Sequence, residues 1–340
     1  MLDTLRHNFS SPLTLSFALG VAARLLKSEF SLPRDVYAAI SIYLLFALGL
    51  KGGVELSQSS MGVIFWPAIV TLLLGCITPV TSYVVLRRLG RFSVADAAGL
   101  AAHYGSVSAV TFLAAQQFAT ALGQPLEGFL PTLLTLLESP GIHIALAIGA
   151  IQTARADRAV ANGTGRQSAP HGAARPTREL RQVLHEVLTA RSMILLVGGL
   201  LVGVVTGESG YEPVKPFFEG LFKGALTIFL LEMGIVAGSR LGDLRQAGAF
   251  LIGFGIVMPI LHGALAVVLG HWAGLSIGGC TVLAAMASSA SYIAAPPAVR
   301  MTLPEANPTY YLTASLAITF PFNLLAGIPL YYQMAKVLHG

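Results

Sequence analysis

Long apolar runs recur along the whole chain, and they limit its possible folds more than any other feature. Of its 340 residues, 54% are hydrophobic and 11% are charged, whereas soluble domains usually carry about 25% charged residues. A membrane-spanning helix needs roughly 20 mostly apolar residues. We therefore predict an all-α integral membrane protein with about ten transmembrane helices. The apolar runs lie at 11–29, 34–55, 61–87, 93–121, 127–153, 191–207, 213–239, 246–270, 275–302 and 308–337.

The distribution of Lys and Arg predicts how these helices are oriented. If the N-terminus lies outside, 16 of the 21 Lys and Arg residues fall on inward loops. Cytoplasmic loops carry such an excess of positive charge. We therefore expect a multi-pass protein of the bacterial inner (plasma) membrane with both termini outside. The five outward basic residues are Arg6, Lys51, Lys215, Lys223 and Lys336.

The two halves of the chain resemble each other. The segment 44–56 is similar to 228–241, with Gly49 and Gly53 matching Gly234 and Gly238 at one offset. Five spans in each half would make the second half enter the membrane from the opposite face. This pattern predicts two inverted repeats, 1–154 and 191–340, as in many secondary transporters. Residues 155–190, rich in Arg, Gly, Ala and Pro, are predicted to form a flexible cytoplasmic loop that ends in a short amphipathic helix.

Polar residues interrupt the apolar pattern at matching places in the fourth and ninth spans. The first interruption covers 103–111, and the second covers 288–292 and is followed by 293–297, which ends in Pro296 and Pro297. Proline lacks a backbone N–H group, so we expect broken helices whose free N–H groups and positive dipole ends face the membrane midplane. Two such ends would bind a small anion. The candidate residues are Gly105, Ser106, Ser108, Thr111, Ser288, Ser289 and Ser291.

Ionisable residues inside membrane spans are costly and often functional. Glu138 lies in the fifth span, where its carboxylate could bind a cation or a proton. Glu232 is either a second functional carboxylate or a partner for a neighbouring polar helix, and Lys51 is a further candidate. His103, His143 and His262 are interpreted as packing residues, since their spacing matches no metal motif. Cys76 and Cys280 both fall inside predicted spans, which implies neither a disulfide framework nor a metal site.

Several other functional classes are disfavoured. The chain has no P-loop, no GxSxG or HExxH motif and no nucleotide-binding glycine fingerprint. Without a P-loop, uphill transport would have to draw on an ion or voltage gradient. A serine–histidine hydrolase using Ser106 or Ser108 with His103 would have no need of an inverted repeat. Because the basic residues are scattered over short loops, a nucleic-acid partner is not expected.

Six segments carry a resemblance to the sodium-dependent bicarbonate transporter family first known from cyanobacteria. The resemblance covers nearly the whole chain. The six segments are GLKGG (49–53), GSVSAVT (105–111), ESP (138–140), SRLGDLR (239–245), SSASYIAAPPAVR (288–300) and LPEANPTYYLTASLAI (303–318). The last two of them are the most specific.

This resemblance implies a homotrimer with elevator-like movement, and inhibition by a PII-like cytoplasmic protein. It assigns the Gly, Ser and Thr candidates of the two breaks to the anion. A possible sodium site would use Glu138, Ser108 and Ser291. Three positions depart from the cyanobacterial pattern: Tyr292 replaces an aspartate, Glu138 replaces another aspartate, and Val236 stands where a glutamate is expected.

The leading functional hypothesis is import of a small inorganic anion, with bicarbonate as first choice, by symport with sodium. No cofactor is expected beyond this coupling ion, and membrane lipid is the other expected partner. Because a phenol with a pKa of about 10 is a poor substitute for a carboxylate, Tyr292 leaves a second hypothesis open, a sodium-independent carrier of another small anion. A transporter-like membrane sensor or scaffold is the third.

Overall fold

The computed structural model describes residues 10–138, 140–163, 189 and 191–340. The described residues form helices and their connections, with no strand among them. Seven helical stretches in this part of the chain are long and apolar enough to cross a membrane. The prediction of an all-helical, multi-pass membrane protein is confirmed at this level, and the ten-span, inverted-repeat arrangement stays a prediction.

The N-terminal half contains seven described helices, of which α5 and α6 form one interrupted span. Serine caps mark the starts of α2 and α5: Ser11 accepts a hydrogen bond from the Thr14 N–H group at 3.2 Å, and Ser93 accepts one from the Asp96 N–H group at 3.0 Å. The helices are α2 (Pro12–Leu25), α3 (Arg34–Gln58), α4 (Met61–Arg88), α5 (Val94–Tyr104), α6 (Ala109–Ala121), α7 (Leu130–Glu138) and α8 (Pro140–Gly163).

The C-terminal half begins with α10 and contains several local departures from α-helical geometry. Its longest apolar stretch, Pro216–Trp272, is divided by a short 3₁₀ turn, Leu241–Asp243. The elements are α10 (Arg191–Tyr211), the π-helix η1 (Pro216–Gly220), α11 (Phe222–Arg240), α12 (Leu244–Trp272), α13 (Ile277–Ala287), α14 (Ala295–Thr302), α15 (Pro308–Thr313), the π-helix η3 (Ala314–Thr319), α16 (Phe320–Phe322), the π-helix η4 (Asn323–Gly327) and α17 (Ile328–His339).

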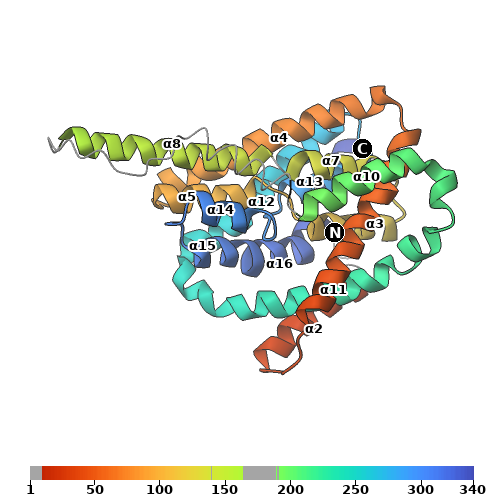
Figure 1. Cartoon of the computed structure of the whole chain (residues 1–340), viewed down its shortest axis with the longest axis horizontal. Coiled ribbons are helices and arrows are strands. Elements are labelled where there is room, and N and C mark those ends of the chain that lie inside the picture. Colours follow the sequence, from red (N-terminus) through yellow and green to blue (C-terminus); the bar gives the residue numbers. More distant parts are fainter. Residues whose placement is uncertain (1–9, 139, 164–188, 190) are drawn as a thin grey trace.

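Helix α8 departs from the expected boundaries. It continues to Gly163, whereas a flexible loop was predicted from residue 155. The sequence of 154–163 explains this difference, since it is rich in Ala and Arg, which are strong helix formers. Figure 1 shows α8 projecting from the rest of the molecule. The remainder of the predicted loop, including its amphipathic helix, lies mostly outside the described residues.

Glycines allow two helix pairs to pack at backbone distance. Helix α2 packs against α11, and α3 packs against α10. A Cβ atom added at Gly20 would clash with the Leu231 carbonyl oxygen, and one added at Gly53 would clash with that of Leu200. Such small-residue contacts are typical of membrane helices. In Figure 1 these four helices lie together, with α5, α14 and α15 on the other side of the molecule.

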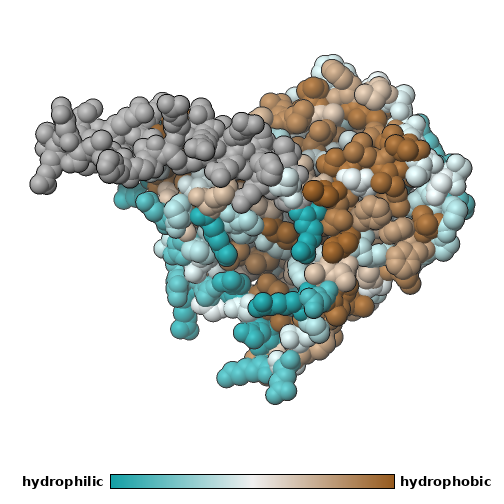
Figure 2. Space-filling view, viewed as in Figure 1, coloured by the Kyte–Doolittle hydropathy of each residue, from teal (hydrophilic) through white to brown (hydrophobic). Residues whose placement is uncertain are grey.

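The surface is divided by hydropathy. Figure 2 shows hydrophobic residues over much of the face near α3, α4 and α10, and hydrophilic residues along the left and lower edges. Exposed apolar side chains include Phe65 (56%), Trp66 (62%) and Leu201 (62%). A lipid environment would cover these side chains without cost, which agrees with the membrane assignment.

Candidate functional site

The segments predicted as the fourth and ninth spans are both interrupted, as the sequence predicted. In the first, α5 ends at Tyr104 and α6 begins at Ala109. In the second, α13 ends at Ala287 and α14 begins at Ala295. All of the hydroxyl residues proposed from these interruptions are buried, with exposures of 4% or less.

The two interruptions lie against each other and are joined by hydrogen bonds that backbone N–H groups donate. The Ser108 N–H group donates to Ser289 Oγ at 2.8 Å. The Ser291 N–H group donates to the His103 carbonyl oxygen, also at 2.8 Å. His103 Nδ1 contacts the Ser291 carbonyl oxygen at 2.5 Å, and the ring of His103 stacks on Tyr311. His103 therefore packs the two breaks together, in agreement with its interpretation as a packing residue.

A small cavity brings together the three residues predicted to bind sodium. Glu138, Ser108 and Ser291 all line it, together with Tyr292, and its volume is about 20 Å³. A cavity needs about 10–15 Å³ to hold one water molecule, so this one has room for one water or one small cation. Carboxylate and hydroxyl oxygens are suitable ligands for a hard cation. The cavity is too small for a four-atom anion in this conformation.

Glu138 is held next to the first break by backbone contacts. Ser106 Oγ donates to the Glu138 carbonyl oxygen at 3.0 Å. Three residues later, Gly141 lies so close to Gly105 that an added Cβ would clash with the Gly105 carbonyl oxygen. Glycine at both positions lets the start of α8 approach the break. These contacts position the Glu138 carboxylate at the cavity, where it is 5% exposed.

The first break has the backbone donors expected for an anion site. Ser108 caps α6 by accepting a hydrogen bond from the Thr111 N–H group at 3.3 Å. The N–H groups of Ala109 and Val110 belong to the first turn of this helix, which supplies no intrahelical acceptor for them. The Thr111 hydroxyl is buried and has no hydrogen-bond partner among the described residues. These groups could donate to an anion that reaches the end of α6.

The second break differs from the expectation of matching N–H donors. Pro296 and Pro297 occupy the first turn of α14 rather than the gap before it. Proline is tolerated there because its missing N–H group would lack an intrahelical acceptor anyway. The prolines therefore begin the helix and remove two of its free donors. The second break contributes mainly hydroxyl and carbonyl groups, among them Ser291 Oγ, which accepts from the Ala294 N–H group at 3.3 Å.

Ser288 belongs to a polar cluster beside the cavity, not to its wall. Its hydroxyl donates to Asn323 Oδ1 at 3.3 Å, and Asn323 Nδ2 donates to the Ser288 carbonyl oxygen at 3.0 Å. Tyr331 donates to the same Asn323 oxygen at 3.0 Å. Asn323 and Tyr331 were not predicted as site residues. An amide within the segment predicted as the tenth span was the available signal.

Glu232 and Lys51 both lie away from the central cavity. Glu232 Oε2 accepts a hydrogen bond from the Leu32 N–H group at 3.1 Å, and thereby ties α11 to the α2–α3 connection. This contact favours the structural interpretation of Glu232. Lys51 lies 3.3 Å from Glu219 in a different cavity. His262 also has a packing contact, with Thr81 Oγ1 at 2.8 Å.

Together, the apolar helices, the paired breaks and the carboxylate-lined cavity define a multi-pass membrane protein with a buried polar centre. Within the described residues there is no cluster of three or more His, Cys, Asp or Glu residues that would hold a transition metal. Residues 12–336 match the family model of the Na⁺-dependent bicarbonate transporter superfamily. The chain belongs to this superfamily, and a family of carriers implies transport rather than catalysis. No curated protein matches the chain significantly.

Proposed function

We propose that this protein is a secondary transporter that imports a small inorganic anion, with bicarbonate as first candidate, by symport with sodium. The observation that carries this proposal is the contact between the two breaks beside Glu138. The N-terminus of α6 supplies donors for an anion. Glu138, Ser108 and Ser291 supply oxygen atoms for sodium in a cavity of suitable size. Family membership supports both the ion and the substrate.

Glycine contacts support an inverted repeat within this proposal. Gly49 packs against Gly199, and Gly234 packs against Gly20. The sequence match equates Gly49 with Gly234, so the α3–α10 contact has a counterpart in the α11–α2 contact. The next matched pair follows the same pattern, because Gly53 packs against Gly203 and Gly238 packs against Arg24. Two such corresponding contacts are expected when a helix of each repeat packs against a helix of the other repeat.

An elevator-like mechanism requires a fixed body and a moving body. The boundary between the two would lie between the helix pairs that cross at these glycines and the interrupted helices. We propose that α2, α3, α10 and α11 form a fixed scaffold. The interrupted helices, with α4, α7, α8, α12 and α15–α17, would form the moving body. Because the central cavity is too small for a four-atom anion in this conformation, substrate binding requires such a movement, or a local opening. The homotrimer and the PII-like cytoplasmic regulator rest on the family resemblance alone.

Uptake by the purified protein in proteoliposomes tests this function. We expect labelled bicarbonate to accumulate when an inward sodium gradient is imposed, and to accumulate less with sodium equal on both sides. Accumulation that does not depend on the sodium gradient would favour a sodium-independent carrier of a small anion. A protein that binds bicarbonate but does not move it would instead favour a sensor or scaffold.

The predicted topology gives a separate test. A reporter inserted within 160–175 should be cytoplasmic, and one fused after His339 should be external. The arrangement in Figure 1 supports this prediction, since α8 projects on the same side as the α4–α5 and α14–α15 junctions, opposite the α10–α11 turn. A cytoplasmic C-terminus would require an odd number of spans and would contradict the inverted repeat.

A further inference from the structure

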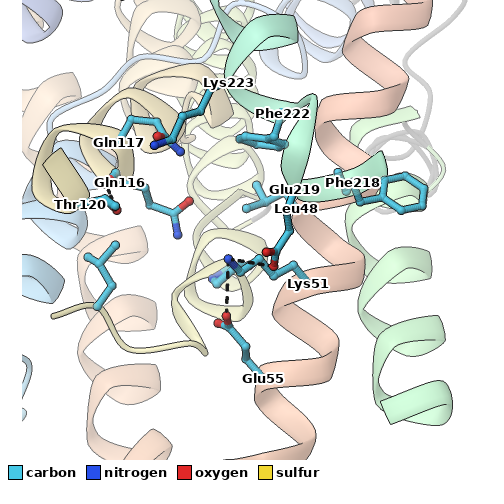
Figure 3. A pocket seen from close by; sticks show the side chains of 13 residues that line it. Leu48, Lys51, Glu55, Gln116, Gln117, Thr120, Phe218, Glu219, Phe222 and Lys223 are labelled. Atoms are coloured by element: carbon cyan, nitrogen blue, oxygen red, sulfur yellow. Dashed lines mark hydrogen bonds and ion pairs between the residues drawn. The ribbon is translucent and has the colours of Figure 1, made fainter. Parts of the chain in front are cut away.

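A second and much larger cavity lies between α3, α6 and the start of α11, as Figure 3 shows. Its volume is about 230 Å³, enough for a small anion together with several water molecules. Its charged and amide side chains come from two sides: α3, α11 and the π-helix η1 before it contribute two lysines and two glutamates, and α6 of the proposed moving body contributes two amides. These residues are Lys51, Glu55, Glu219, Lys223, Gln116 and Gln117.

The charges in this cavity are unevenly paired. Lys51 lies 3.3 Å from Glu219 and 3.9 Å from Glu55, so both carboxylates face the same ammonium group. Lys223 has no carboxylate within ion-pair distance among the described residues. In Figure 3, Lys223 lies beside Gln117 at the opposite end of the cavity from Glu55. The Lys223 end therefore combines an unneutralised cation with an amide donor, which suits an anion.

The larger cavity lies on the same two helices as the central one. On α3, Leu45 lines the central cavity, whereas Leu48 and Lys51 line the larger one, at a spacing that keeps all three on one helix face. On α6, Ser108 caps the helix at the central cavity and Gln116 lines the larger one. At 1.5 Å per residue these two positions are about 12 Å apart along the helix. Leu45, on the central cavity, and Leu48, on the larger one, are both buried.

We propose that the larger cavity is a second anion-binding site, an external vestibule through which the anion enters the site at the two breaks. This inference rests on the proposed function. Lys223 attracts and holds the anion, while Lys51 is kept in place by Glu219 and Glu55. Leu45 and Leu48 form the apolar barrier that must separate before the anion reaches α6.

Thiol labelling tests the site without requiring transport. Thr120 is an exposed residue of the cavity wall, and Thr120→Cys, in a Cys76→Ser background, would place a thiol there. Sulfonatoethyl and trimethylammonium-ethyl methanethiosulfonate carry opposite charges and would be added from outside. We expect both to react, and Lys223→Gln to lower the anionic-to-cationic rate ratio about fivefold, as loss of one charge at close range predicts.

Lys215→Gln is the matched control, because Lys215 pairs with Glu212 at 3.4 Å and does not line the cavity. It should leave the rate ratio unchanged. Lys223→Gln should also raise the KM for bicarbonate at constant maximal rate. Labelling only from the cytoplasmic side would contradict the proposal of an external vestibule. The same anionic-to-cationic rate ratio in Lys223→Gln and Lys215→Gln would contradict it too. A charge-dependent ratio in a protein that takes up no bicarbonate would keep the anion site and reject the proposed function.

Discussion

Replacing Ser108 or Ser289 with Leu is expected to abolish anion uptake while leaving the protein in the membrane. The Ser289 hydroxyl accepts from the Ser108 N–H group and donates to the Met286 carbonyl oxygen at 2.7 Å. Ser289→Leu removes this link and leaves a buried N–H group unsatisfied, at a cost of about 1–3 kcal/mol. Ser108→Leu removes the cap of α6, a loss of about 0.5–2 kcal/mol. In both variants the larger side chain would also occupy the space between the breaks.

The loss of uptake in the two leucine variants must be distinguished from a loss of folded protein. Ser108→Ala and Ser289→Ala remove the same hydroxyls without adding bulk, and should retain folded protein with reduced uptake. Thr206→Leu is the matched control, since Thr206 is exposed on α10, where its hydroxyl donates to the Val202 carbonyl oxygen at 2.8 Å, and it lines neither cavity. Uptake of labelled bicarbonate should be normalised to folded protein measured by size-exclusion chromatography. Full uptake by both leucine variants would show that the substrate site does not lie between the two breaks.

Features encoded locally could be predicted from the sequence. Apolar runs of span length gave the helical membrane architecture, because no soluble core could bury so many apolar residues. The break at Gly105–Ser108 was predictable for a similar reason, since small and hydroxyl residues interrupt an apolar helix there. Ser108, Glu138 and Ser291 were each identified individually. Their convergence on one cavity followed only from the family resemblance, and the structure places them together.

Features that depend on distant partners could not be predicted in this way. The sequence left Glu232 open between a functional carboxylate and a structural partner, because its hydrogen bond to Leu32 joins residues 200 positions apart. Asn323 contacts Ser288 across 35 positions, and no helical periodicity links the two. The prolines of the second break were misplaced for another reason. Proline disfavours a helix interior but is accepted in the first turn, and the sequence alone did not distinguish the two settings.

Glu138→Gln is expected to weaken sodium-dependent uptake far more than Glu232→Gln. Among the described residues, Glu138 is the only carboxylate lining the central cavity, and a hydrogen bond or ligand contact to a charged group contributes about 1.5–3 kcal/mol. Loss of that charge should raise the sodium concentration for half-maximal uptake about 10- to 150-fold. Glu232→Gln is a matched control, because an amide oxygen can still accept from the Leu32 N–H group. Equal, mild effects of both substitutions would show that Glu138 is not part of the sodium site.

Tyr292→Asp tests whether the departure from the cyanobacterial pattern sets the strength of sodium coupling. Tyr292 lines the central cavity beside Glu138, Ser108 and Ser291. Its phenol stays neutral near pH 7, whereas an aspartate would add a second carboxylate to the same wall. We therefore expect weak sodium dependence in the parent and half-maximal uptake at a lower sodium concentration in the variant. Uptake should be measured against sodium concentration for both proteins at constant ionic strength. If the parent curve is flat in sodium and remains flat in Tyr292→Asp, the cavity is not a sodium site, and the protein is a sodium-independent anion carrier.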